Sequence, residues 1–363
     1  MNKEVISRKQ ATSIIILYWL GSILIMGTTE AGKDLWIAII IATIVAIPVL
    51  FIYSRLMKLY PGKDFFEISI DVFGKIGGKI LILFYIEYAL HLSALETNNY
   101  SEFFHIGILP ETPKYVFAIM LVAICIFAAK MGLEVTGRCA EINIFFVLLS
   151  IIVITLLSIP YFDFSNIKPV LYNGWKPVIG ASFTLSSFPF AESVIFIYIL
   201  SSLKQGESIY KVVYSALGVT SIVLIVVLTG IILVLGEYPA QMYYFPTQQS
   251  ISIIDIGDFI QRLDIFSPLV YFLNYFIKIT ICLIFASKGF TKLFNIREYK
   301  KLVVPLGFFV FVFSLILYGS AMETFADAKY YKYYAFPFQF IFPIIILIVA
   351  EIKNLINKKN ATF

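Results

Sequence analysis

Long apolar segments recur along most of the sequence, and they constrain the fold more than any other feature. Hydrophobic residues make up 60% of the 363 residues, charged residues only 14%, and the mean hydropathy is +0.89, which excludes a soluble globular chain. Each segment approaches the roughly 20 residues that a helix needs to cross a bilayer. We therefore expect an all-α membrane protein with one transmembrane domain (1–363) and ten spanning helices at about 11–27, 35–54, 80–103, 115–129, 139–159, 178–203, 212–235, 267–287, 302–322 and 335–352.

The lysines and arginines predict the orientation of these helices. An even number of spans places both termini on one side, and a cytoplasmic N-terminus puts most of the 28 basic residues in cytoplasmic segments. The basic head MNKEVISRKQ imitates a signal peptide, but no small-residue cleavage site follows it, so we expect a retained helix. The net charge of +5 then reflects topology, and we expect membrane lipid and no nucleic acid as a partner.

Residue types that carry enzyme chemistry are sparse. His91 and His105 are the only histidines, and Cys125, Cys139 and Cys282 lie in or beside apolar segments without CxxC spacing. The sequence contains no HExxH, Walker or GxSxG motif. We expect no enzyme, no catalytic residue, no metal site and no cofactor.

Two expected helices carry interruptions at comparable positions. The helix at 11–27 contains Gly21 and Ser22, and the helix at 178–203 contains SSFPFAES at 186–193. Pro189 removes a backbone donor and clashes with the preceding turn, which frees carbonyls that need partners inside protein. Matched interruptions are typical of inverted-repeat transporters, so we expect a LeuT-like 5+5 fold with repeats at 11–160 and 178–356 and broken first and sixth helices. The alternative is that Pro189 only kinks a packed helix and Gly21 only permits close helix contact.

We expect the two interruptions to face each other across a small pocket near the middle of the membrane. Exposed amides of the restarted helices can hold a ligand carboxylate, while freed carbonyls and a serine hydroxyl are available to an ammonium group. The expected ligand-binding residues are Gly21, Ser22, Ser186, Ser187, Phe188, Phe190, His91 and Lys278, and the supporting or proton-linked residues are Glu192, Glu87 and Pro189.

Lys278 is expected at the depth of this pocket. Counted at about 1.5 Å per residue from the start of its helix, it lies roughly 16 Å into the membrane, and Glu192 is the deep carboxylate nearest in level. We expect the two to pair; the alternative is that the lysine stem extends to a wet cavity.

Glu87, His91 and Asn98 have the spacing of one helix face within the expected helix at 80–103. Ionisable groups at that depth face a cavity or a partner. They form either a wall or proton relay of the site, or an interhelical hydrogen-bonded seam.

The segment 237–264 is too polar to span and long for a plain loop. Ile253, Ile256, Ile260 and Leu263 recur at three- and four-residue spacing, which predicts a short extracellular amphipathic helix. It acts either as a lid over the entrance or as a docking surface for a partner.

Several motifs together resemble the B subunit of bacterial spore germinant receptors. They run in order as GKDLWIA (32–38), KLYPGKDFFEIS (58–69), ILPETPKYVFAIMLVAICIFAAKMGLEVTGRCAEIN (108–143), FPFAES (188–193), FPTQQSISIIDIGDFIQRLD (245–264) and FASKGFTKLF (285–294). The resemblance implies the amino acid, polyamine and organocation transporter superfamily, ten helices, and a receptor for a small-molecule germinant, commonly an amino acid. It also implies the inner membrane of the spore and partner A and C subunits.

Three functions follow from these observations. The first is a receptor subunit that senses a nutrient, the second a proton-coupled amino acid permease, and the third a scaffold that only assembles partner subunits. The first two need the same pocket and differ only in whether the pocket alternates its access.

Overall fold

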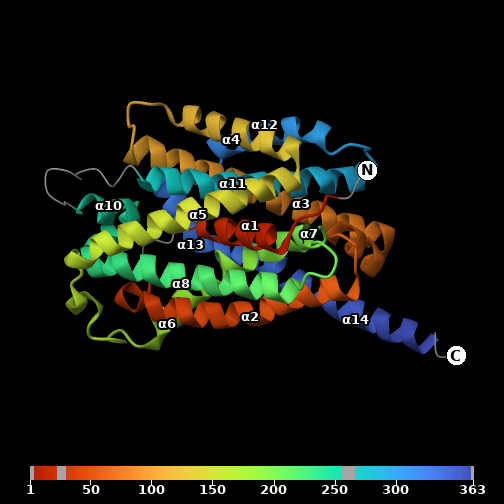
Figure 1. Ribbon diagram of the computed structural model, residues 1–363, viewed down its shortest axis with the longest axis horizontal. Helices are drawn as coiled ribbons and strands as arrows, with labels where there is room; N and C mark the ends of the chain where they lie inside the picture. The colour runs from red at the N-terminus through yellow and green to blue at the C-terminus, as the bar shows by residue number, and fades with distance from the viewer. Residues whose placement is uncertain (1–3, 23–29, 255–265, 361–363) are drawn as a thin grey trace.

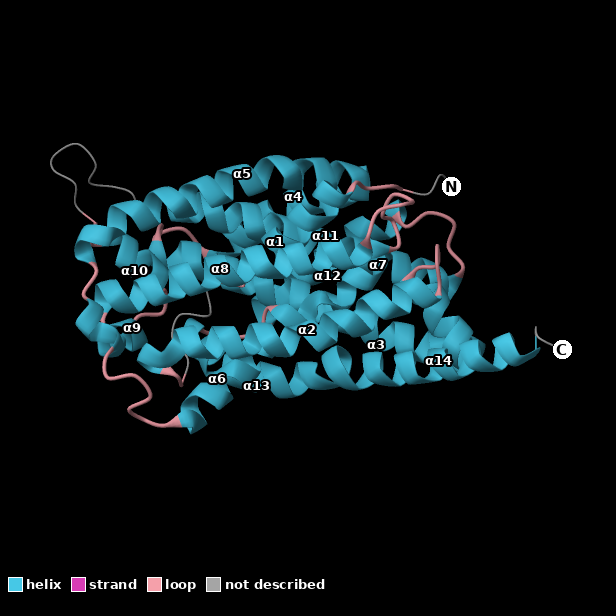
Figure 2. Cartoon of the chain, turned by 60° about the horizontal axis from the view of Figure 1, so that its bottom comes forward, coloured by secondary structure: helices cyan, strands magenta, loops and turns pink. Residues whose placement is uncertain are grey.

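The computed structural model describes residues 4–22, 30–254 and 266–360. These residues are almost entirely helical, and the described part of the chain forms no strand beyond an isolated bridge between Ile6 and Leu203. Figures 1 and 2 show the long helices packed side by side in one bundle, with both chain termini at the same end. The all-α fold is confirmed.

The first half of the chain forms long helices. They are α1 (Arg8–Leu20), α2 (Leu35–Leu59), α3 (Phe65–Gly107), α4 (Lys114–Met131) and α5 (Leu133–Ser158). Capping boxes set two of their starts, because Ser7 and Gln10 exchange side-chain and backbone hydrogen bonds before α1, and Asp64 and Glu67 do so before α3.

The second half is more interrupted. It comprises α6 (Trp175–Ser187), a 3₁₀-helix (Phe190–Ile195), α7 (Phe196–Leu200), α8 (Ile209–Leu235), α9 (Glu237–Met242), α10 (Pro246–Ser252), α11 (Phe266–Phe294), α12 (Lys300–Ile316), α13 (Ala321–Phe336), a π-helical turn (Pro337–Ile341) and α14 (Phe342–Asn360).

The expected count of ten spans is not confirmed. Among the described residues, seven helices are long and apolar enough to cross a membrane, or up to eight if the pair Lys300–Ile316 and Ala321–Ala328 forms one span. That pair is bent by 97°, so the expected span at 302–322 is not one straight helix. The bend arises where Ser320 accepts a hydrogen bond from the Glu323 amide and starts α13 as a new helix.

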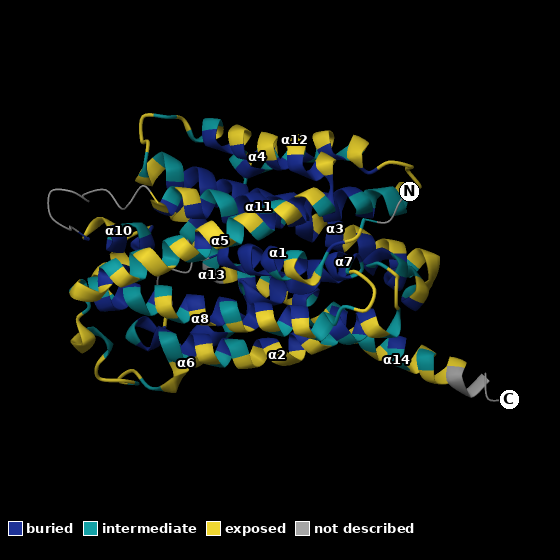
Figure 3. Ribbon diagram, viewed as in Figure 1, coloured by how far each residue is buried: buried dark blue, intermediate teal, exposed yellow. Residues whose placement is uncertain are grey.

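Burial divides the bundle into a buried centre and an exposed outer layer (Figure 3). α11 packs along α3 at the centre, where Gly289 lies against Ile86. α5 instead turns Ile142, Phe145 and Leu156 outward, each more than half exposed. A continuous apolar exterior of this kind is the surface that lipid covers, and the chain is an integral membrane protein.

The described part of the segment 237–264, which ends at Ile254, holds two short helices, α9 and α10. Ile251 and Ile254 pack against Ile154 and Leu157 at the end of α5. Most of the amphipathic helix expected after Ile253 lies outside the described residues. Its role as a lid, and the division into repeats at 11–160 and 178–356, stay predictions.

We predict that Gly289→Val destabilises the fold while Gly218→Val, on the outer face of α8, does not. A Cβ at Gly289 would lie 2.6 Å from Ile86 Cγ1, whereas a Cβ at Gly218 meets no atom within 4 Å. Overpacking of this kind costs about 1–3 kcal/mol. Thermal unfolding of both variants in detergent measures the effect, and equal midpoints would contradict the packing of α11 on α3.

Candidate functional site

The interruption predicted in SSFPFAES is present. α6 ends at Ser187, Phe188 is extended with φ −133° and ψ 107°, and after Pro189 the chain continues as the 3₁₀-helix Phe190–Ile195. Proline cannot donate to the preceding turn, and the change of helix type leaves backbone carbonyls without intrahelical partners. The break therefore needs polar side chains from other helices.

α1 also stops at the predicted position. Its last residue is Leu20, Gly21 follows as the cap, and the Ser22 side chain is fully buried. Residues 23–29, where the predicted helix continues, lie outside the described residues.

Lys278 of α11 lies between these two helix ends. Its ammonium forms ion pairs with Glu96 of α3 and with Glu192 Oε2 at 2.7 Å, and it donates a hydrogen bond to Ser22 Oγ at 2.7 Å. The side chains of Lys278, Glu96 and Glu192 have no solvent exposure. A buried charge is stable only when it is paired and hydrogen-bonded, so this cluster ties α1, α3, α11 and the 3₁₀-helix together.

The lysine side chain fills the space where sequence analysis placed a pocket. Its Nζ lies 4.6 Å from the centre of the Phe188 ring and 5.1 Å from that of Tyr18, within range for cation–π attraction. A Cβ on Gly21 would lie 3.4 Å from Lys278 Cδ. The absence of a side chain at Gly21 thus leaves room for the lysine stem.

A chain of hydrogen bonds extends from Glu192 to the break in α6. Tyr331 of α13 donates to Glu192 Oε1 at 3.0 Å, and the hydroxyls of Tyr331 and Tyr88 lie 3.1 Å apart. Gln339, in the π-helical turn, donates to Tyr88 Oη and to the Ser187 carbonyl, both at 2.9 Å.

The same side chains supply the partners that the break requires. Gln339 Oε1 accepts from the Ser187 hydroxyl at 2.7 Å while its amide satisfies the Ser187 carbonyl. The Tyr53 hydroxyl donates to the Ala191 carbonyl at 3.3 Å. Non-helical backbone at membrane depth persists only where protein satisfies it in this way.

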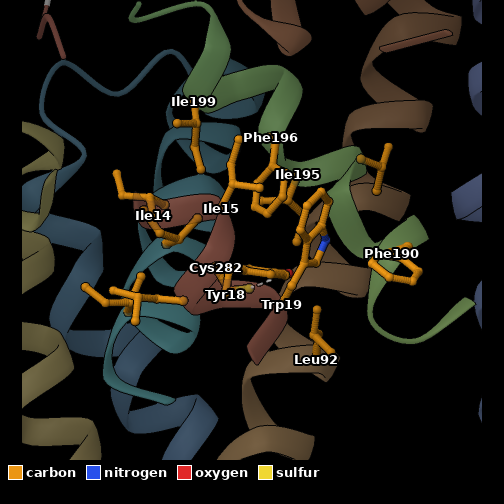
Figure 4. Packing of buried hydrophobic residues seen from close by; sticks show 14 of the residues in the cluster. Ile14, Ile15, Tyr18, Trp19, Leu92, Phe190, Ile195, Phe196, Ile199 and Cys282 are labelled. Carbon is orange, nitrogen blue, oxygen red and sulfur yellow. Dashed lines mark hydrogen bonds between the residues drawn. The ribbon is translucent and has the colours of Figure 1, made fainter. Parts of the chain in front are cut away.

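Aromatic packing holds α1 against the broken helix (Figure 4). Trp19 meets Phe190 edge-on at 5.6 Å, and Tyr18 meets Phe196 at 4.8 Å. The Tyr18 hydroxyl lies 3.6 Å from Cys282 Sγ of α11. Phe190 is therefore packed against α1, while Phe188 faces Lys278.

Three of the predicted site residues lie apart from this cluster. Glu87 accepts hydrogen bonds from the Tyr334 hydroxyl, and the His91 ring packs on Tyr334 at 4.6 Å. His91 and Glu96 are five residues apart, which places them about 140° apart around α3. Ser186 bonds back to the Ser182 carbonyl at 2.7 Å within α6.

The cluster also contains four residues that no spacing pattern in the sequence indicated: Glu96, Tyr88, Tyr331 and Gln339. Glu96 was the only one with a signal in the sequence, as a carboxylate in an apolar segment. In the described part of the chain, no group of three or more His, Cys, Asp or Glu side chains could hold a metal ion.

Solved structures identify the fold. The fold matches MhsT in complex with L-phenylalanine with a TM-score of 0.60 at 15% identity, over 96% of this chain and 99% of that one. It matches a nucleobase-cation-symport-1 family transporter, closed with bromovinylhydantoin bound, with a TM-score of 0.67 at 11% identity, over 90% of this chain and 76% of that one. The chain is thus a membrane protein with a LeuT-like transporter fold.

Sequence comparison then gives the family. The model for "Spore germination protein" matches residues 5–321. Spore germination protein KB of Bacillus subtilis (strain 168) is 27% identical over 366 residues, covering 99% of this chain and 98% of the relative. Spore germination protein A2 of the same organism is 25% identical over 336 residues, covering 92% and 90%. The chain belongs to the spore germination protein family.

We predict that Lys278→Met destabilises the protein strongly, because it leaves two carboxylates buried without their cation. Breaking a buried pair by removing one partner costs about 3–5 kcal/mol. The triple variant Lys278→Met/Glu96→Gln/Glu192→Gln should recover most of that loss, since neutral amides need no counter-charge. Folded yield and thermal midpoint in detergent measure the effect.

Lys211→Met, at an exposed position near the start of α8, is the matched control and should behave as the wild type. A Lys278→Met protein as stable as this control would show that the cluster does not contribute to the fold.

Proposed function

We propose that the chain is the nutrient-sensing subunit of a spore germinant receptor and that an amino acid binds at the Lys278 cluster. One observation carries the proposal: the Lys278 ammonium lies between the end of α1 and the break after α6, held by Ser22 Oγ and by the carboxylates of Glu96 and Glu192. The position is built to hold an ammonium group, and a side chain of the protein itself holds it in this state.

An amino acid has the chemistry to replace this internal contact. Its ammonium would take the place of Lys278 at Glu192 and Glu96, and its carboxylate would receive the displaced lysine. The exchange adds no net charge to a buried site, which keeps its electrostatic cost low. Phe188, which now covers the lysine, would lie against the ligand side chain.

Binding at this position would change the fold at two helix ends. The cluster contacts the end of α1 through Ser22 and the 3₁₀-helix through Glu192. Breaking and remaking its ion pairs would therefore shift the conformations of both segments. A ligand shifts a conformational equilibrium only through such differential contacts. We assign the receptor's response to this conformational change. We also propose that the A and C subunits are the partners to which the change is transmitted.

A proton-coupled amino acid permease is the second candidate, and the charge count of the cluster favours it. The cluster holds two carboxylates and one ammonium, so a proton on either carboxylate would make it neutral. Binding of that proton together with the ligand would couple amino acid uptake to the proton gradient. A scaffold that only assembles partner subunits is a third candidate, and it needs no such cluster.

The family and the topology of the basic residues support placement in the spore inner membrane with both termini cytoplasmic. In that orientation α9 and α10 lie on the outer face, on the side from which a germinant arrives.

Equilibrium binding and uptake, measured together, test the proposal. The full chain is reconstituted in proteoliposomes and offered each common amino acid in radiolabelled form. Saturable binding without uptake is the result expected of a receptor, and uptake driven by a proton gradient would select the permease. The absence of both binding and uptake would rule out the receptor and the permease and would leave the scaffold.

We predict that Glu96→Gln lowers the affinity for the amino acid at least about tenfold, a change of about 1.4 kcal/mol. The substitution keeps the shape of the side chain but removes one of the two carboxylates that hold the ammonium. Glu87→Gln, on another face of α3 and bonded to Tyr334, is the matched control and should bind as the wild type. Equal affinity of the two variants would place the ligand elsewhere.

A further inference from the structure

A cavity lies at the end of the bundle opposite the chain termini. Its volume is about 70 Å³, and its walls come from α5, α8, α10, α11 and the last residue of α1. Figure 1 shows α5, α8, α10 and α11 converging at this end. Most of its wall is apolar and includes Ile151, Ile154, Val226, Val227 and Ile231.

The lining of this cavity includes a polar side chain whose hydrogen-bond acceptor is unsatisfied. The Asn274 side chain lines it, is 1% exposed, and its Oδ1 accepts no hydrogen bond from any residue that the structure describes. The side chains of Tyr271 and Thr247 line the same cavity. A buried acceptor without a donor costs free energy comparable to a lost hydrogen bond, so a molecule that brings a donor is favoured there.

The volume and the lining restrict what that molecule can be. One water occupies about 10–15 Å³ of such volume, so the cavity exceeds the space of a single water several-fold. The lining has polar side chains that can hold a water, namely Thr155, Ser158, Thr247, Ser250, Ser267, Tyr271 and Asn274. The aliphatic side chains that make up most of the wall offer no partner to further waters and favour an alkyl group. None of the described lining residues is charged, which disfavours an ion or a zwitterion.

We propose that this cavity binds a small neutral molecule with one hydrogen-bond donor and a short aliphatic body, of which a short-chain alcohol is the simplest example. The hydroxyl donates to Asn274 Oδ1, and the alkyl chain lies against Ile151, Ile154 and Val227. The ligand class differs from that of the Lys278 cluster, and the proposal does not depend on the function assigned to that cluster.

The position of the cavity gives the ligand a route to the charged cluster. Asn274 precedes Lys278 by four residues on α11, about 6 Å along the helix and on the same face. Leu20, which also lines the cavity, directly precedes Gly21 and Ser22. A bound alcohol would therefore contact the end of α1 that the Lys278 cluster holds.

Photolabelling tests the site directly. The full chain in lipid nanodiscs is irradiated with a short-chain alcohol that carries a diazirine, and adducts are located by peptide mass spectrometry. We expect adducts on residues that line the cavity, and we expect excess 1-butanol to remove them. Adducts confined to lipid-facing residues such as Phe145, or cavity adducts that 1-butanol does not reduce, would overturn the proposal.

Two variants on α5 separate the cavity from the surrounding lipid. Ile154→Phe fills the cavity and should abolish the competable adducts, while Ile152→Phe adds the same group at a position that is 56% exposed and should leave them unchanged. Equal labelling of both variants would contradict the site.

The role of Asn274 is tested from the ligand side as well as by Asn274→Leu. A diazirine alkane of the same length lacks the hydroxyl, and we expect it to label the cavity of the wild-type chain several-fold less than the alcohol does. Equal labelling by the two probes would show that the cavity binds apolar molecules without recognising the hydroxyl. This result would overturn the role of Asn274 even if Asn274→Leu failed to fold.

Discussion

Three charged side chains buried in the middle of an apolar bundle impose the strongest constraint on this structure. Lys278 cannot stay charged at zero exposure without partners, and Glu96 and Glu192 cannot stay charged without it. The three come from α11, α3 and the 3₁₀-helix, so their pairing sets how these elements approach one another. α1 ends before Gly21 and α6 ends before Phe188. The lysine side chain occupies the space between these two helix ends.

The breaks in turn depend on a layer of neutral polar side chains behind the charges. Gln339 satisfies the end of α6 through both its amide and its carbonyl, and Tyr331 and Tyr88 continue the network to Glu192. The π-helical turn places Gln339 where a regular helix would shift it around the axis. Such a network is stable when every member is satisfied, and a change at one member is felt at the others. A ligand that enters the cluster would therefore act on several helices at once.

Much of this arrangement could be predicted from the sequence, and the limits have physical causes. The break at Pro189 and the end of α1 at Gly21 follow from local backbone chemistry, and counting residues from helix ends brought Lys278 level with Glu192. Glu96 could not be chosen in this way, because the direction that a side chain takes around a helix matters only once the neighbouring helices are placed. Spacing alone selected Glu87 and His91, which lie on another face of α3. Tyr331 and Gln339 are uncharged residues in an aromatic segment, so nothing in the sequence distinguishes them as site residues. Hydropathy did not detect the bend before α13, because Gly319 and Ser320 interrupt the helix without adding charge.

The Lys278 ammonium lies between the end of α1 and the break after α6, in contact with the carboxylates of Glu96 and Glu192. Solid-state NMR on the full chain in lipid, with ¹⁵N-lysine and ¹³C-glutamate, measures this contact through the dipolar coupling between the lysine Nζ and glutamate Cδ. We expect a coupling typical of an ion pair, with nitrogen and oxygen within about 4 Å. We also expect that Lys278→Arg removes this signal and that Glu96→Gln and Glu192→Gln each weaken it. A Lys278 nitrogen with no carboxylate coupling and the chemical shift of a solvated ammonium would show that Lys278 is not paired with Glu96 and Glu192.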